Sequence, residues 1–124
     1  MTDDSLRLPD VPPPEVVLLP ASNDVQLEGV EQRLVHYAVH LAYLHWLLFA
    51  APLIVMSGRD REHSASAMHF AGQALDLHTD SLEADEALLF HALIAFSAPA
   101  RLVDYTVGRA PGGERFVHLE VAKP

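Results

Sequence analysis

The chain has 124 residues, half of them hydrophobic, which is enough for one domain with a single modest core. Its 17 acidic and eight basic residues give a formal charge of −9, which argues against a general nucleic-acid-binding protein, because such a protein presents a basic face. The absence of cysteine excludes disulfides, thiolate metal sites and cysteine nucleophiles. Any bound metal would have to be held by imidazole and carboxylate groups, and the chain contains eight histidines that can serve.

The first 24 residues are acidic and contain five of the nine prolines, so we expect an extended arm with one short strand at 15–19. This composition is the opposite of a secretory signal, which predicts a protein that is cytoplasmic when it is synthesised. Residues 25–124 are expected to form one domain. The most apolar stretch, 41–56, is shorter than the roughly 20 residues of a membrane-spanning helix. It also contains His45 and Pro52, so no membrane span is expected.

Residues 25–50 have the pattern of an amphipathic helix. Large hydrophobic side chains recur in steps of three and four, and Pro52 follows as a stop signal. The expected buried face consists of Val30, Leu34, Tyr37, Leu41, Leu44 and Leu48. His36 and His40 lie one helical turn apart, a spacing that can bind a metal. Because no third ligand is evident near them, we interpret both as residues on the flank of the helix.

The rest of the chain combines strands with one further helix. That helix is predicted at 81–96, with Ser81 as its N-cap. Its expected buried face consists of Leu88, Leu89, Ala92, Leu93 and Phe96. Strands are predicted at 52–58, 73–78, 101–108 and 115–121. This order of elements predicts an α+β domain with two main helices and a mainly antiparallel sheet.

Two of the predicted strands carry polar side chains on one face. Alternation places Asp76 and His78 together on the strand at 73–78, with two leucines on its other face. On the last strand it places His118 and Glu120 together, opposite a face of valine and leucine. Burying an unpaired carboxylate or imidazole is costly, so these polar faces are candidate functional surfaces.

His69, Asp76 and His118 form the candidate metal site. A catalytic zinc site without thiolates uses three imidazole or carboxylate ligands and leaves one position open. His69 and Asp76 are seven residues apart, an odd separation that would send them to opposite faces of a regular strand. Gly72, between them, allows the bend that brings both to one side. His118 would then supply the third ligand from a neighbouring strand.

The stretch HFAGQALD, residues 69–76, matches the signature H-x-x-G-x-A-x-D. In this the chain resembles the zinc D-alanyl-D-alanine carboxypeptidases and related bacterial and phage peptidoglycan peptidases, which share their fold with the hedgehog signalling domain. LIVMSGRDR, residues 53–61, resembles the family's strand that ends in Ser-Gly with an arginine just after. RFVHLEV, residues 115–121, resembles its final strand. The resemblance extends from about residue 28 to 122 and implies a hedgehog/D,D-peptidase-like fold.

By position, the resemblance implies that His69, Asp76 and His118 bind Zn2+. It also implies that Arg59 or Arg61 holds the carbonyl or the terminal carboxylate of the substrate. The metal would polarise the peptide carbonyl and activate a water molecule, while the arginine would stabilise the developing oxyanion. The implied function is hydrolysis of peptide bonds in peptidoglycan stem peptides or crosslinks. Such an enzyme would reach the cell wall by lysis or be carried in a phage particle.

The general base is the point at which the sequence departs from the family. Many members have a glutamate three residues before the last histidine, where this chain has Arg115. Glu114 is the nearest substitute. Glu120 is the second candidate for the base, or alternatively a hydrogen-bonding partner of a ligand imidazole. The serine usually found two residues before the first histidine is replaced by Ala67.

Two alternatives to a peptidase stay open. Loss of the general base would leave a zinc-binding domain without hydrolytic activity, serving as a structural or interaction part, for example of a phage particle. The other alternative is a metal-free α+β binding domain. In that case His69 would be a core histidine, and Asp76 would be neutralised by Arg59 or Arg61.

Overall fold

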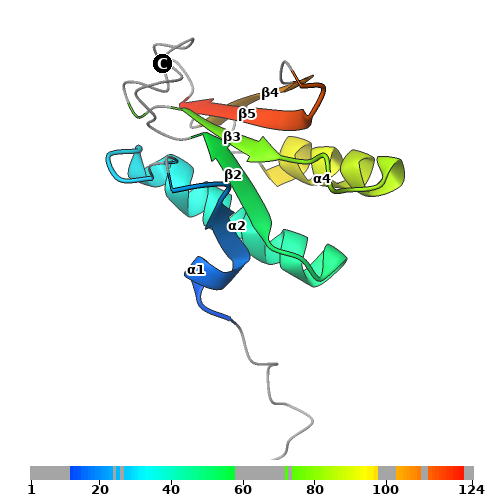
Figure 1. Cartoon of the computed structure of the whole chain (residues 1–124), viewed down its shortest axis with the longest axis horizontal. Coiled ribbons are helices and arrows are strands. Elements are labelled where there is room, and N and C mark those ends of the chain that lie inside the picture. The colour runs from blue at the N-terminus through cyan, green and yellow to red at the C-terminus, as the bar shows by residue number, and fades with distance from the viewer. Residues whose placement is uncertain are drawn as a thin grey trace, which may run out of the picture.

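The computed structural model describes residues 12–23, 25, 27–57, 72, 74–97, 103–109 and 112–121. Over these ranges the helices are α1 (Pro14–Val17), α2 (Gln32–Phe49) and α4 (Ala84–Ser97). The strands are β1 (Leu18–Pro20), β2 (Leu53–Ser57), β3 (Ala74–His78), β4 (Val103–Arg109) and β5 (Arg115–Val121). They form one five-stranded sheet in the order β1-β2-β3-β5-β4, in which β1 and β2 are parallel and the other pairs antiparallel (Figure 1). The predicted α+β class with a mainly antiparallel sheet is confirmed.

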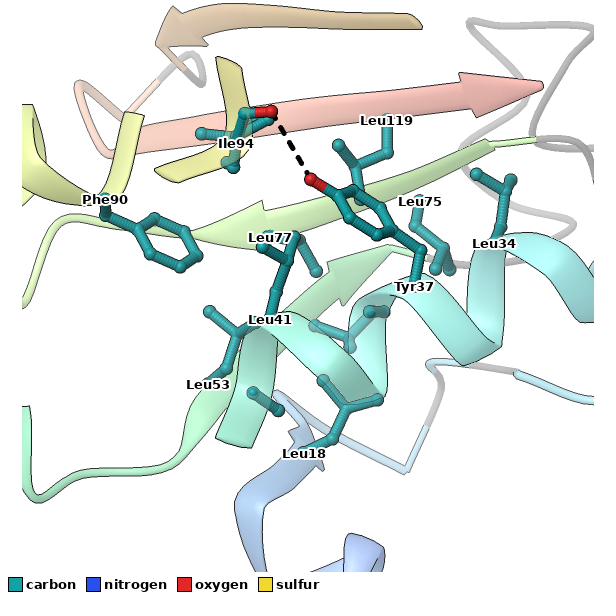
Figure 2. Close-up of a cluster of buried hydrophobic side chains, with 14 of the residues drawn as sticks. Leu18, Leu34, Tyr37, Leu41, Leu53, Leu75, Leu77, Phe90, Ile94 and Leu119 are labelled. Atoms are coloured by element: carbon teal, nitrogen blue, oxygen red, sulfur yellow. Dashed lines mark hydrogen bonds between the residues drawn. The ribbon is translucent and has the colours of Figure 1, made fainter. Parts of the chain in front are cut away.

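The hydrophobic core lies between one face of the sheet and the two long helices. Leu75 and Leu77 of β3 and Leu119 of β5 are fully buried, as the alternation of these strands predicts. In Figure 2 these leucines lie beside Tyr37 of α2, whose hydroxyl donates a 3.5 Å hydrogen bond to the carbonyl oxygen of Ile94 on α4. One face of the sheet is therefore committed to the core, and the opposite face is left for polar side chains.

α2 begins later than the hydrophobic pattern predicts, because the chain first turns at Gly29, whose φ of 83° is left-handed. The helix ends at Phe49, and its C-cap Ala50 is also left-handed and donates its N–H to the carbonyl oxygen of Trp46. Leu34, Tyr37 and Leu41 are buried as expected, whereas Leu44 is partly buried and Leu48 is exposed.

The second half of α2 turns a different face inward because it packs against α4 as well as against the sheet. His45 is buried there, with its ring edge-on to Phe49 and to Phe90 of α4. Its Nδ1 lies 2.7 Å from the carbonyl oxygen of Ala51. The hydrophobic pattern of α2 alone cannot show that the helix also packs against α4.

The predicted buried face of α4 is wrong. The buried residues are Ala87, Phe90 and Ile94, whereas Leu88 is 70% and Phe96 92% exposed. Leu89 is exposed, and Ala92 and Leu93 are only partly buried. α4 is apolar on several sides, so its sequence contains more than one apolar stripe at helical spacing, and only packing against the sheet and α2 selects one.

The start of α4 also differs from the prediction. The helix begins three residues after Ser81, so Ser81 is not its N-cap. Instead the Glu86 carboxylate accepts a 2.9 Å hydrogen bond from the backbone N–H of Glu83, which is the return half of a capping box.

The described part of the N-terminal segment belongs to the domain. The strand predicted at 15–19 is instead the short helix α1 followed by β1, which pairs with β2. Val17 and Leu18 are buried in the core, and the carbonyl of Pro12 accepts a 2.6 Å hydrogen bond from the Tyr43 hydroxyl. The boundary expected at residue 24 is therefore too late. None of the helices in the described ranges has the length and apolarity needed to cross a membrane.

Candidate functional site

Asp76 and His118 lie directly opposite each other on the neighbouring strands β3 and β5. Asp76 Oδ1 and His118 Nδ1 are 2.7 Å apart, although the two residues are 42 positions apart in the sequence. Because residues next to them on each strand point into the core, both side chains extend from the opposite face of the sheet. The antiparallel register thus assembles the polar pair that the sequence analysis proposed.

Glu120 completes a chain of three polar side chains. It follows His118 by two residues on β5 and therefore shares its face, and its Oε1 lies 3.2 Å from His118 Nε2. The imidazole thus has a carboxylate at each ring nitrogen. The exposed fractions of the side chains are 17% for His118, 21% for Asp76 and 28% for Glu120. The three groups are sheltered but reachable from solvent, as a binding site requires.

The pair belongs to a row of polar residues that crosses four adjacent strands. Ser57 of β2 is opposite Asp76, and Thr106 of β4 is opposite His118. Exposure increases along the row, from buried Ser57 through the partly buried pair to exposed Thr106. The described part of the site is therefore closed on the β2 side and open toward β4, one of the two edge strands of the sheet.

Gly72, the glycine of the HFAGQALD motif, is held by a close backbone contact. Its φ is 74°, and a Cβ at this position would collide with the carbonyl oxygen of Gly29. The Gly72 carbonyl in turn accepts a 2.6 Å hydrogen bond from the backbone N–H of Glu31, at the start of α2. A residue with a side chain would strain both the dihedral angle and this contact. The motif glycine thus connects the segment before β3 to the turn before α2.

Several proposed site residues fall outside the described ranges. These are His69, Arg59 and Arg61, together with Ala67. Among the residues that are described, no group of three or more histidine, aspartate or glutamate side chains is arranged to hold a metal ion. The structure brings together two of the three proposed ligands, Asp76 and His118.

The two candidate bases differ in position. Glu120 contacts His118, whereas Glu114 is exposed at the turn that precedes β5. β5 pairs without interruption from Arg115 to Val121, so Glu114 lies about 13 Å from His118 along the extended strand. Arg115, which occupies the position of the usual glutamate, donates a 2.7 Å hydrogen bond to the carbonyl oxygen of Leu82. The structure therefore places Glu120, and not Glu114, beside the pair.

The other histidines of interest are separate from this pair. His36 and His40 are exposed on α2, where His36 contacts Gln32, as expected for flank residues. His78 is on β3 with Asp76 but pairs with Phe116. It therefore lies at the opposite end of the β3–β5 pair from Glu120, which is opposite Ala74. None of these three has a described contact with His118.

The sequence analysis did not identify Ser57 or Thr106 as site residues. Ser57 was part of a predicted buried strand, in which alternation would put it on the core face with Leu53 and Val55. A register shift between Val55 and Ser57 changes this, because Met56 is an extra residue in β2. Nothing in the sequence marks Thr106 as a site residue. Its place beside His118 follows only from the pairing of β4 with β5.

The donor atoms of the pair fit a zinc ion. An imidazole nitrogen and a carboxylate oxygen bound to one tetrahedral zinc at ~2.0–2.2 Å lie about 3.4 Å apart. Asp76 Oδ1 and His118 Nδ1, now 2.7 Å apart, would need to separate by about 0.7 Å. A comparison with known proteins finds no match, whether with protein-family models, with curated proteins or with solved structures.

Proposed function

We propose that this protein is a zinc-dependent peptidase of the hedgehog/D,D-peptidase type that hydrolyses peptide bonds in peptidoglycan stem peptides or crosslinks. The observation that carries the proposal is the cross-strand pair of Asp76 and His118, 2.7 Å apart on the polar face of the sheet. These are two of the three residues that the family resemblance assigns to the metal. The pair also lies at the side of the sheet that is open to solvent over β4.

In this proposal Asp76 and His118 hold the metal together with His69, and Arg59 or Arg61 binds the carbonyl or carboxylate of the peptide. A zinc ion held there supplies Lewis-acid polarisation of the peptide carbonyl and lowers the pKa of a bound water. His118 Nδ1 lies 2.7 Å from Asp76 Oδ1 and its Nε2 lies 3.2 Å from Glu120 Oε1, so with Nδ1 on a zinc ion the Nε2–H would be donated to Glu120. Glu120 is thereby the carboxylate that orients the ligand imidazole.

Zinc binding and hydrolysis should be tested in that order. Purified wild type should contain about one zinc per chain and should cleave soluble wall fragments, detected by mass spectrometry of the stem peptides. His118→Ala should lose both the zinc and the activity. His78→Ala is the matched control, because it removes an imidazole from the same strand as Asp76 without touching the pair. A wild-type protein that binds no zinc would refute the proposal and favour a metal-free binding domain.

A second function is favoured by the side chain of Arg115. It stands where the family has its glutamate, its guanidinium bonds the carbonyl of Leu82, and its Nε lies 3.6 Å from Asp80. Arg115 therefore has a structural role, and no general base is present at the position where the family has its glutamate. The corresponding alternative is a zinc-binding structural or interaction domain without hydrolytic activity, for example in a phage particle. Zinc-loaded wild type that cleaves no stem peptide would favour this alternative. If the wild type is active, Glu114→Gln and Glu120→Gln variants would identify the base.

A further inference from the structure

The register shift in β2 brings a buried hydroxyl to the candidate site. Val55 pairs with Leu77 and Ser57 with Asp76, so the extra residue Met56 moves Ser57 from the register of the core to that of the polar pair. Directly opposite residues of antiparallel strands have Cβ atoms about 4.5–5.5 Å apart and share a face. Ser57 therefore lies across the strand pair from Asp76, on the side away from His118.

The Ser57 hydroxyl is a buried polar group in need of a partner. Ser57 is 9% exposed, and its Oγ has no hydrogen-bond partner in the described structure. A buried hydroxyl without a partner costs about 1–3 kcal/mol, and such groups in folded proteins call for an explanation. The residue directly across the strand pair is Asp76, whose carboxylate is a candidate acceptor and whose Oδ1 faces His118 Nδ1.

We propose that Ser57 is a positioning residue for Asp76, and this inference rests on the proposed zinc site. A zinc ion held between Asp76 and His118 would replace their direct 2.7 Å contact, and a ligand carboxylate is then oriented by hydrogen-bond donors beside it. A carboxylate has about four lone-pair sites, and a ligand carboxylate is commonly held by a hydrogen bond to the oxygen that does not ligate. Ser57 donates that bond to Asp76 in the zinc-bound state.

The test compares zinc affinity with the stability of the metal-free protein. Zinc dissociation constants are measured by competition with a chelating dye, and melting temperatures are measured in excess chelator. Ser57→Ala should weaken zinc binding about 10- to 100-fold, the usual effect of losing a group that orients a ligand. It should leave the metal-free protein at least as stable as wild type, because it removes an unpaired buried hydroxyl.

Thr79→Val is the matched control. Thr79 is fully buried and its Oγ1 is likewise without a partner in the described structure, but it lies past the end of β3, three residues from Asp76. Its removal should leave zinc affinity within about twofold of wild type. Ser57→Thr keeps the hydroxyl and should retain affinity, which keeps the test decisive if Ser57→Ala does not fold.

The outcomes separate this inference from the function on which it rests. Wild type that binds no zinc refutes the proposed function. Wild type that binds zinc with the same affinity as Ser57→Ala refutes only the role of Ser57. Equal weakening in Ser57→Ala and Thr79→Val also refutes it, because the effect would then follow from altered packing.

Discussion

Asp76 on β3 and His118 on β5 are cross-strand partners, and the 2.7 Å contact between Oδ1 and Nδ1 is the centre of the polar face. Two features of the sequence produce it. Alternating leucines in β3 and alternating valine and leucine in β5 turn one face of each strand into the core, which leaves their polar residues on the other. The register between the strands then decides which polar residues meet. A slip of one residue would separate the pair and expose the leucines.

Replacement of Asp76 by asparagine should strongly weaken zinc binding without unfolding the protein. The amide keeps the size of the side chain but not its charge, so zinc affinity should fall by more than about 100-fold. The contact with His118 is partly exposed, and its loss should cost the metal-free protein only about 1 kcal/mol or less. Isothermal titration with zinc and urea denaturation in chelator measure the two effects. Unaltered zinc affinity would show that Asp76 is not a ligand.

Substitution of Gly72 by alanine should strongly destabilise the domain. Its left-handed φ costs roughly 1–2 kcal/mol for a residue with a Cβ, and the added methyl would also collide with the carbonyl of Gly29. We expect a total loss of about 2–4 kcal/mol in the free energy of unfolding. Gly112→Ala is the control, since a Cβ at Gly112 has no atom within 4 Å. Similar stability of the two variants would contradict the close approach.

The strands β2, β3, β4 and β5 were predictable from the sequence because they depend on local alternation, which also assigns Asp76 and His118 to polar faces. β5 occupies the predicted range 115–121, and β3 and β2 fall within one or two residues of theirs. Ser57 was not predictable, because a β-bulge depends on how two strands pair and leaves no mark in the alternation of one. The buried face of α4 was predicted wrongly for a related reason. Its apolar stripes are equivalent until the sheet and α2 bury one of them.

The corrected face of α4 can be checked by two phenylalanine substitutions. Phe90 is fully buried against His45 and the core, so Phe90→Ala should lower the free energy of unfolding by about 3–5 kcal/mol. Phe96 is exposed, so Phe96→Ala should change it by no more than about 0.5 kcal/mol. Urea denaturation measures both values. A larger loss of stability in Phe96→Ala than in Phe90→Ala would instead support the buried face expected from the sequence.

Stability should decrease as the pH is lowered through the histidine range, because two histidines are held neutral in the fold. Burial lowers the pKa of His45, against opposing effects of its bond to Ala51 and of Glu86. Burial, with a smaller contribution from Arg115, also lowers the pKa of His91. The unfolded chain therefore binds more protons than the folded chain below the ordinary histidine pKa of 6.5. The stability these groups contribute is complete above that pH and is lost as the pH falls toward their lowered folded values.

His45→Asn separates this effect from general acid sensitivity. Asparagine offers an N–H near the position of Nδ1, so the bond to the Ala51 carbonyl can be kept while the titrating ring is removed. The variant should be less stable at pH 7.5 because the ring leaves a cavity, by about 2 kcal/mol. Its melting temperature should nevertheless fall less than that of wild type between pH 7 and 5. His36→Asn, at an exposed position, should keep the wild-type slope. A His45→Asn profile parallel to wild type would mean that protonation of His45 does not oppose folding.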